Sequence, residues 1–166
     1  MSDAVDAILD QWRQEKPDLI DELWPMSIIG RVQRLSRVLE RELATFFAAR
    51  GLQHWESDVL LTLRRAPGPL TAGALLRSAM VTSGAITNRI DRLEARGLVE
   101  RVRDTEDRRS VRVQLTAQGR ELLDELFAEH LANEARLLEG IPPESREPLA
   151  AILRGALEHL GDTELG

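Results

Sequence analysis

Short polar side chains and arginines lie among apolar residues over positions 82–92, and this mixture suits contacts with a nucleic-acid duplex. Hydroxyl and amide groups can reach base edges or phosphate oxygens, and guanidinium groups pair with phosphate or guanine. The residues concerned are Thr82, Ser83, Thr87, Asn88, Arg89 and Arg92. A second group follows at Asp107, Arg108, Arg109 and Arg112. A solvated polar helix face would contain similar residues, so the surrounding elements must distinguish the two interpretations.

The charge of the chain is unevenly distributed along the sequence. The whole chain has a net charge of −6, but the segment 64–112 contains 11 arginines against 6 acidic residues and so carries +5. A basic segment within an acidic protein is the electrostatic pattern expected of nucleic-acid binding.

The polar residues of 82–92 fall on a helix that follows a shorter helix across a tight turn. Thr71 precedes an apolar-patterned helix at 72–79, a turn follows at 80–83, and a second helix is predicted over 83–96. The apolar side of this second helix consists of Ile86, Ile90 and Leu93. A short helix, a tight turn and a second helix with a polar outer face predict a helix-turn-helix, with the second helix in the major groove of DNA.

A β-hairpin is predicted directly after this second helix. Residues 98–103 have the composition of a strand, 104–110 are polar and charged, and 111–115 alternate strictly between apolar and polar residues. A hairpin with an arginine-bearing tip behind a helix-turn-helix is typical of the wing of a winged helix.

The arginines of the hairpin have distinct expected roles. Arg109 is expected in the minor groove, where a narrow A·T-rich groove concentrates negative potential, and Asp107 can orient its guanidinium group. Arg108 and Arg112 would add phosphate contacts whose strength falls with salt. The alternative for Asp107 and Arg109 is a solvated loop ion pair worth no more than about 1 kcal/mol.

Helices with apolar stripes are predicted on both sides of the winged helix. Residues 2–16 form one helix, 17–25 a connector, and Ser27 can cap a long helix that ends near Gly51. A helix follows at 54–65. Two more follow Thr116, separated by Pro142-Pro143. Because the flanking stripes lie outside the winged-helix core, we expect a second copy of the chain to cover them.

The predicted fold is therefore mostly α with a small β-hairpin wing, a winged helix-turn-helix with N- and C-terminal dimerisation helices. The expected organisation is N-terminal helices at 1–50, the DNA-binding lobe at 51–116 and C-terminal dimerisation helices at 117–166.

Other classes of function find little support in the sequence. The sequence contains no cysteine, which excludes thiolate catalysis and cysteine-based redox sensing. The histidines lack metal-ligand spacing, and no glycine-rich phosphate loop or nucleophile motif is present. We therefore expect neither an enzyme nor a metal or cofactor site. Without an apolar run near 18 residues or a leader, we expect no membrane association and a cytoplasmic location.

The segment 75–120 resembles the MarR family of bacterial regulators. The tip Asp104-Thr105-Glu106-Asp107-Arg108-Arg109 and the strand ending Leu115-Thr116 look like the most recognisable motif of that family. The similarity covers roughly residues 27–160. It implies a dimer with two winged lobes and intertwined terminal helices that binds a pseudo-palindromic DNA site, as a repressor.

Within that family, segments 6–18 (DAILDQWRQEKPD) and 80–99 (MVTSGAITNRIDRLEARGLV) look like the urate-responsive branch. That resemblance implies a ligand site made by Trp12, Asp58, Arg89 and Arg101. An anionic purine would stack on the aromatic ring, and the two arginines would offset its charge. Because Arg89 lies in the recognition helix, ligand binding there would act directly on DNA release.

Each of these residues also has a simpler interpretation. Trp12 could be an aromatic residue of the dimer interface, Asp58 an acid in the first turn of a helix, and Arg89 a phosphate contact. The ligand could equally be a phenolic compound or another aromatic carboxylate. A winged-helix adaptor that binds proteins and no DNA is the alternative from another functional class.

Overall fold

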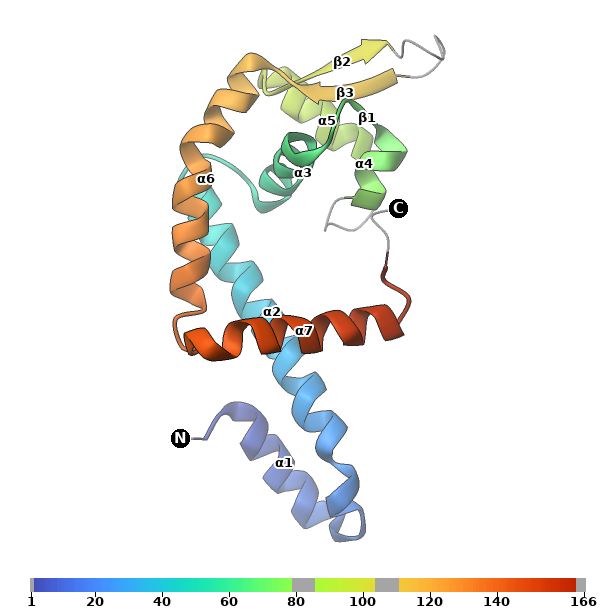
Figure 1. The fold of residues 1–166 in the computed structure, drawn as a ribbon, viewed down its shortest axis with the longest axis vertical. Helices are drawn as coiled ribbons and strands as arrows, with labels where there is room; N and C mark the ends of the chain where they lie inside the picture. The colour runs from blue at the N-terminus through green and yellow to red at the C-terminus, as the bar shows by residue number, and fades with distance from the viewer. Residues whose placement is uncertain (1, 79–85, 104–110, 164–166) are drawn as a thin grey trace. The chain divides into compact units, whose positions relative to one another are not determined.

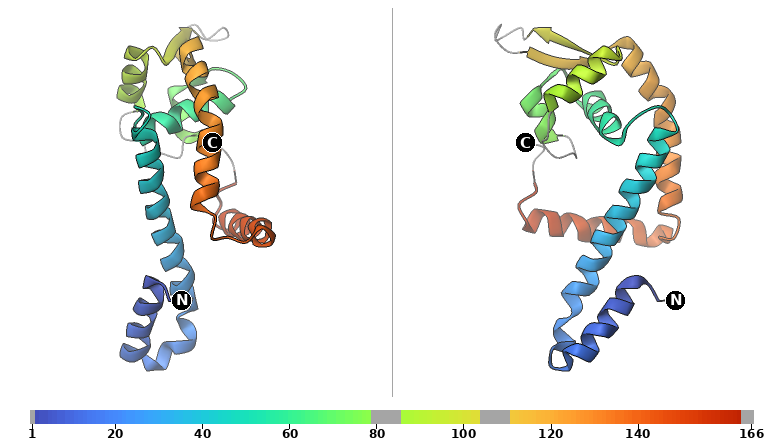
Figure 2. Two further views of the ribbon diagram at one scale, coloured as in Figure 1. Left: turned by 90° about the vertical axis from the view of Figure 1, so that its left-hand side faces the viewer. Right: turned by 180° about the vertical axis from the view of Figure 1, so that it is seen from behind.

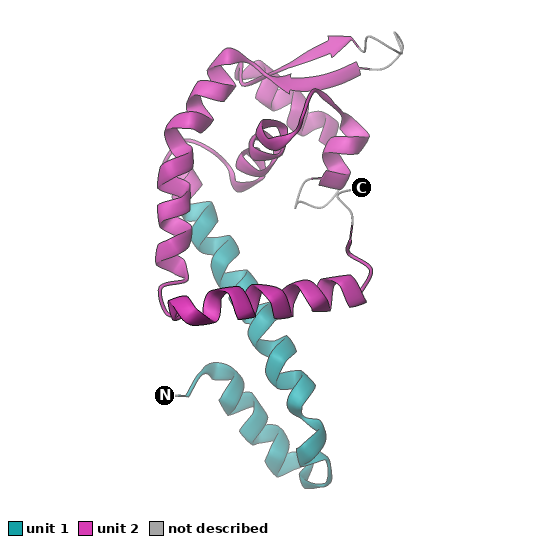
Figure 3. Cartoon of the chain, in the orientation of Figure 1, with its two compact units in different colours: residues 1–45 teal, residues 46–166 magenta. Residues whose placement is uncertain are grey.

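The computed structural model describes residues 2–78, 86–103 and 111–163. The chain consists of two compact units, residues 1–45 and 46–166 (Figure 3). Long helices dominate both units, and the strands belong to the second (Figure 1).

The first unit is a helical hairpin. It contains α1 (Ala4–Glu15), a short 3-10 helix (Pro17–Glu22) and all but the last three residues of α2 (Trp24–Ala48). Val5 and Leu9 of α1 pack with Leu23 in a small buried cluster. The predicted helix at 2–16 is thus confirmed, and the predicted connector contains a 3-10 turn.

The predicted cap at Ser27 is wrong, because α2 begins earlier, at Trp24. Pro25 occupies the first turn of α2, where its missing N–H would have no intrahelical partner in any case. Ser27 instead lies within the helix, and its Oγ accepts a hydrogen bond from Nη1 of Arg31 at 2.6 Å.

The second unit contains the elements of a winged helix followed by two further helices (Figure 1). In chain order these are α3 (His54–Arg65), β1 (Leu70–Thr71), α4 (Ala72–Ser78), α5 (Ile86–Ala95), β2 (Val99–Arg103), β3 (Val111–Leu115), α6 (Ala117–Leu137) and α7 (Pro143–His159). The predicted helix at 54–65 is confirmed, and the one predicted at 72–79 is confirmed over 72–78, where the described residues end. Thr71 caps α4, because its Oγ1 accepts the backbone N–H of Ala74 at 3.1 Å.

The sheet has three antiparallel strands in the order β1-β3-β2, so the predicted hairpin is present and a third strand joins it. Val99 lies opposite Leu115 and Arg101 opposite Val113 in the β2–β3 register. The short strand β1 pairs Leu70 with Val113 on the other edge of β3. Two residues are too few to show a period in a sequence, so the sequence did not predict β1. The strand forms through its antiparallel pairing with β3.

The core of this unit lies where α3, α4 and α5 meet the sheet (Figure 2). Its fully buried side chains include Val59, Leu60, Leu75, Ile90, Leu93, Val99 and Val113. Each such aliphatic side chain contributes about 1.5–3 kcal/mol when it is removed from water. The apolar side predicted for the second helix is therefore the buried side of α5.

Helices α6 and α7 follow the sheet. Thr116 caps α6 as predicted, since its Oγ1 accepts the N–H of Gly119 at 3.0 Å. Pro142 ends the preceding turn, and α7 begins at Pro143. None of the residues of α7 is buried, and Ile152 is 70% exposed. Within the described ranges, none of these helices combines the length and apolar character needed to cross a bilayer.

Candidate DNA interface and ligand site

The outer face of α5 presents the polar residues that the sequence assigns to DNA. Thr87, Asn88 and Arg92 are exposed, while Ile90 and Leu93 on the opposite side are almost fully buried. This division fixes which side of the helix is available to a partner. The exposed hydroxyl, amide and guanidinium groups are those that read base edges and phosphates.

Five of the expected DNA-binding residues lie outside the described residues. They are Thr82 and Ser83, which precede α5 in the sequence, and Asp107, Arg108 and Arg109, which lie between β2 and β3 in the sequence. The strands that lead to the tip are described, and they place the hairpin directly after α5, as a wing requires.

Arg112 stands on β3, and its side chain is partly buried. Its Nη1 donates to the backbone oxygen of Pro69 at 3.3 Å and so connects β3 with the turn before β1. This contact supports the three-stranded sheet, a role that the sequence did not suggest.

An ion pair fixes the end of α5 against the start of α3. Nη1 of Arg96 donates to Oε2 of Glu56 at 2.7 Å, and its Nη2 donates to the backbone oxygen of Gly51 at 3.0 Å. The same Glu56 oxygen accepts the N–H of Gln53 at 2.7 Å, and Glu56 is only 4% exposed. One buried carboxylate thus caps α3 and holds the end of α5.

Arg101 of β2 lies against α5. Its guanidinium pairs with the carboxylates of Asp91 and Glu94, and its backbone N–H donates to Oε1 of Glu94 at 3.2 Å. The hydrogen bond to Asp91 is the main cause that raises the pKa of the Arg101 guanidinium, opposed by partial burial and assisted by both negative charges. Arg101, expected at the ligand site, is therefore engaged by two acids of α5.

Two other expected ligand residues, Arg89 and Asp58, lie near Trp55, which the sequence did not indicate as a site residue. The guanidinium carbon of Arg89 lies 5.5 Å from the centre of the Trp55 ring. Asp58, one turn after Trp55 on α3, is only 9% exposed. Among the described residues, its Oδ2 has no hydrogen-bond partner. The spacing of Trp55 and Asp58, three residues apart on one helix, was the available signal. Trp12 belongs to the first unit, where α1 leaves it 41% exposed.

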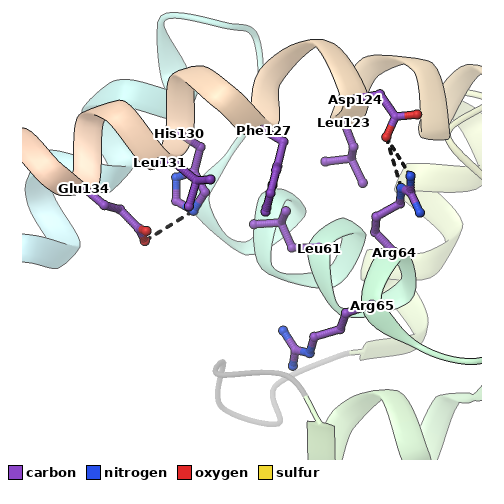
Figure 4. Close-up of a pocket in the computed structure, with 9 residues that line it drawn as sticks. All are labelled: Leu61, Arg64, Arg65, Leu123, Asp124, Phe127, His130, Leu131 and Glu134. Carbon is purple, nitrogen blue, oxygen red and sulfur yellow. Dashed lines mark hydrogen bonds and ion pairs between the residues drawn. The ribbon is translucent and has the colours of Figure 1, made fainter. Parts of the chain in front are cut away.

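A pocket of about 480 Å³ lies between α3 and α6 (Figure 4). Leu61 of α3 faces Phe127 and Leu123 of α6 across it, and Arg64, paired with Asp124 at 2.8 Å, stands at one end. At the other end Nε2 of His130 lies 3.3 Å from Oε1 of Glu134. The pocket is mainly apolar with charged groups at its ends.

Among the described residues no group of histidine and acidic side chains has the arrangement of a metal site. A polar helix exposed beside a hairpin, both held on a helical core, defines a winged helix-turn-helix of the DNA-binding class.

Comparisons with known proteins give the same class. Residues 50–110 match the model of the MarR family. The transcriptional regulator PecS of Dickeya dadantii is 37% identical over 158 residues, which cover 94% of each chain. The chain belongs to the MarR family of transcriptional regulators.

Solved structures share the fold. The MarR family regulator AbsC of Streptomyces coelicolor is similar with a TM-score of 0.72, at 24% identity and over 84% of this chain and 96% of that one. A second MarR family regulator of Streptomyces coelicolor, solved in complex with DNA, gives a TM-score of 0.71 at 24% identity, over 82% of this chain and 88% of that one. The expected winged-helix fold is therefore confirmed.

Proposed function

We propose that this MarR family regulator is a cytoplasmic repressor that binds a pseudo-palindromic operator as a homodimer and releases it when a small anionic aromatic ligand binds. The observation that supports it best is the outer face of α5, where Thr87, Asn88 and Arg92 are exposed beside the hairpin. The helix enters the major groove, and Thr82 and Ser83 contact the duplex near the N-terminus of that helix.

The wing contributes affinity through its arginines. Arg109 enters the minor groove with Asp107 as its orienting partner, and Arg108 contacts phosphate. Arg112 adds a phosphate contact while it supports the sheet. Two-fold symmetry sets the half-sites about one helical turn apart.

A gel shift with the duplex upstream of the protein's own gene tests this part of the proposal. Arg109→Ala should weaken binding by about 1–3 kcal/mol, and the affinity of the wild type should fall steeply with salt. Binding that ignores both salt and this substitution would contradict the proposal and favour the adaptor that acts on proteins.

The homodimer is supported by apolar stripes that the chain leaves exposed. In the first unit Ile28, Ile29 and Val32 of α2 are about half exposed, and in the second unit Ile152 and Leu157 of α7 are also exposed. A second copy would bury them. Sedimentation should give twice the chain mass of 18.6 kDa, and Ile152→Glu should shift the protein toward the monomer. A wild type that sediments as a monomer at micromolar concentration would contradict the dimer.

Urate is our first candidate for the ligand. The buried Oδ2 of Asp58, which has no hydrogen-bond partner among the described residues, can accept an N–H of a purine, and Arg89 can pair with the anionic oxygen. An aromatic ring completes the site, for which Trp12 is the residue implied by the family resemblance. Arg101, the second arginine that the resemblance implies, is already paired with two acids of α5, so Arg89 is the cation more available to the anion.

The energetic demand on the ligand is substantial. To change the operator from mostly bound to mostly free, it must favour the released state by about 5 kcal/mol. Arg89 offers a direct route, since a contact with this residue of α5 acts on the helix that binds DNA.

Urate titration followed by tryptophan fluorescence and by DNA release tests the ligand. Quenching should be lost in Trp12→Phe, with Trp24 and Trp55 intact, and DNA should be released at the same urate concentrations. An absence of quenching in the wild type would exclude urate as the ligand. Quenching that is unchanged in Trp12→Phe would exclude Trp12 from the ligand site.

The pocket between α3 and α6 favours a second candidate, an aromatic carboxylate. Leu61, Phe127 and Leu131 provide apolar contacts, and Arg65 at its edge can pair with a carboxylate. Titration with salicylate separates the two candidates, because Phe127→Ala should abolish that response and leave the response to urate intact.

A further inference from the structure

Asp91 stands on the exposed side of α5, beside the residues proposed to contact DNA. A carboxylate on that surface would repel the phosphates of a duplex. Glu94, one turn further along the same helix, is partly exposed and adds a second negative charge. Two acids on a recognition helix need a physical reason.

Arg101 provides that reason. It projects from β2 on the same side of the strand as the buried Val99, because side chains two residues apart share one face. From there its guanidinium pairs with Asp91 and Glu94 together, through separate nitrogens. The backbone N–H of Arg101 donates to Glu94 as well, at 3.2 Å.

These contacts join the two elements that must reach DNA at the same time. Helix α5 and strand β2 are covalently joined through Gly97, whose φ of +70° places the chain in the left-handed region that glycine adopts readily. The backbone N–H of Leu98 donates to the oxygen of Leu93 at 3.0 Å across this turn. The hydrogen bonds of Arg101 to Asp91 and Glu94 add side-chain contacts that restrain the angle between the helix and the strand.

We propose that Arg101 is a positioning residue for DNA binding, which holds the recognition helix α5 at a fixed angle to the wing through Asp91 and Glu94. The guanidinium touches neither DNA nor ligand. The acids act by holding Arg101, so that helix and hairpin meet successive grooves without a further loss of conformational freedom on binding.

Under this proposal Asp91 and Glu94 strengthen DNA binding, although their negative charge alone would weaken it. If Asp91 and Glu94 merely stood on a DNA-binding surface, Asp91→Asn and Glu94→Gln would each reduce repulsion and tighten DNA binding. As holders of Arg101 they should instead each weaken it by about two- to fivefold, because a partly exposed ion pair contributes up to about 1 kcal/mol. Arg101→Gln should weaken it to a similar or larger extent.

Glu100 serves as the matched control. It is an exposed acid on the same strand, but it lies on the opposite face from Arg101 and accepts a hydrogen bond from Gln114 at 2.7 Å. Glu100→Gln should leave DNA affinity within about twofold of the wild type or tighten it slightly. A uniform effect of removing any acid from the region is thereby separated from an effect through Arg101.

Anisotropy measurements on a fluorescent duplex at several salt concentrations provide the test. The triple variant Asp91→Asn/Glu94→Gln/Arg101→Gln should bind no more weakly than Arg101→Gln alone, because the three residues act as one unit. The slope of log affinity against log salt should not change in Arg101→Gln. A slope reduced by about one, with additive losses, would show a direct phosphate contact and overturn the proposal. Tighter binding by the two acid variants would also overturn it.

Hydrogen exchange on the DNA-free full chain gives a readout that is independent of operator identity. The amides of α5 and the amide of Arg101 should exchange faster in Arg101→Gln and in Glu94→Gln than in the wild type, while α3 stays protected. Arg101→Lys keeps the positive charge and can pair with one acid, so its amide exchange rates should lie between those of the wild type and those of Arg101→Gln. Unchanged amide exchange across α5 and β2 in all these variants would contradict the positioning role of Arg101 even if DNA binding changed.

Discussion

Arg89 of α5 lies over the ring of Trp55, with 5.5 Å between its guanidinium carbon and the ring centre. This contact connects α3 with α5 at the edge of the hydrophobic core, against which Trp55 packs. It is worth about 0.5–1 kcal/mol at a partly exposed site, enough to bias the arginine and too little to lock it. Arg89 can therefore turn toward an anion without unfolding the helix.

The first prediction concerns this contact. In a chain whose only tryptophan is Trp55, Arg89→Gln should change the emission of Trp55, because the cation over the ring is removed. Arg92→Gln is the control on the same helix and should leave the emission unaltered. If both variants gave the emission spectrum of the parent, the result would contradict a contact between Arg89 and Trp55 in solution.

The second prediction concerns the start of α6. A Cβ built on Gly119 would lie 2.1 Å from the backbone oxygen of Leu98, and Leu98 itself is buried. Gly119→Ala should therefore lower the free energy of unfolding by about 2–3 kcal/mol, since the strand and helix must separate. Thermal and denaturant unfolding measure this change.

Gly73→Ala is the matched control, also in the first turns of a helix. There the added Cβ would meet only the end of Arg77, at an ordinary 3.6 Å. The higher helix propensity of alanine should leave the protein as stable as the wild type or stabilise it by up to about 1 kcal/mol. Equal destabilisation by the two alanines would contradict the proposed close approach at Gly119.

Much of this architecture could be predicted from sequence patterns, and its exceptions have physical reasons. Strict alternation at 111–115 predicts β3, and an apolar stripe with a polar outer face predicts α5. The strand β1 has no period of its own. Helix α2 begins at Trp24 and includes Pro25 in its first turn. Ser27 has the residue type of a helix cap, so the sequence pattern placed the start of this helix too late.

The candidate sites were predicted less completely, because they depend on contacts between elements. The placement of Asp91 and Glu94 around Arg101 requires the angle between helix and strand, which no spacing within one element contains. The approach of Arg89 to Trp55 similarly requires the packing of α3 on α5. By contrast, the exposure of Asn88 follows from helical periodicity alone.

The third prediction concerns the carboxylate that holds both α3 and α5. Glu56→Ala removes hydrogen bonds to the N–H of Gln53 and to Arg96, and it leaves a buried site empty. The free energy of unfolding should fall by about 1–3 kcal/mol. Asp10→Ala, which removes an exposed ion pair within α1, should cause little change. Similar stability of both variants in urea unfolding would show that Glu56 does not fasten α5.

The fourth prediction concerns pH and the first unit. Asp3 accepts the N–H groups of Val5 and Asp6 at 2.8 and 3.0 Å, and Asp6 accepts the N–H of Asp3 at 3.0 Å. Hydrogen bonds from backbone N–H groups, followed by the contact with Arg31, hold the pKa of both carboxyls below the ordinary value of 3.8. Because the folded pKa values are lowered, the stabilisation is complete above 3.8 and is lost as the pH falls through them.

Amide chemical shifts of Val5 and Asp6 should therefore titrate with midpoints below 3.8, the value of an unperturbed aspartate. Arg31→Gln should move both midpoints upward, since the guanidinium favours the charged form. Midpoints at or above 3.8 in the wild type would contradict the capping arrangement of α1.

The most direct test of the DNA-binding account is the affinity of Asn88→Ala for operator and for unrelated duplex of the same length. The amide of Asn88 is exposed on α5 and carries no net charge, so its loss should affect recognition of bases more than attraction to phosphates. We predict that binding to the operator weakens by about 1–3 kcal/mol while binding to unrelated duplex and its salt dependence stay the same. An unchanged preference for the operator in Asn88→Ala would contradict the assignment of this face of α5 to the major groove.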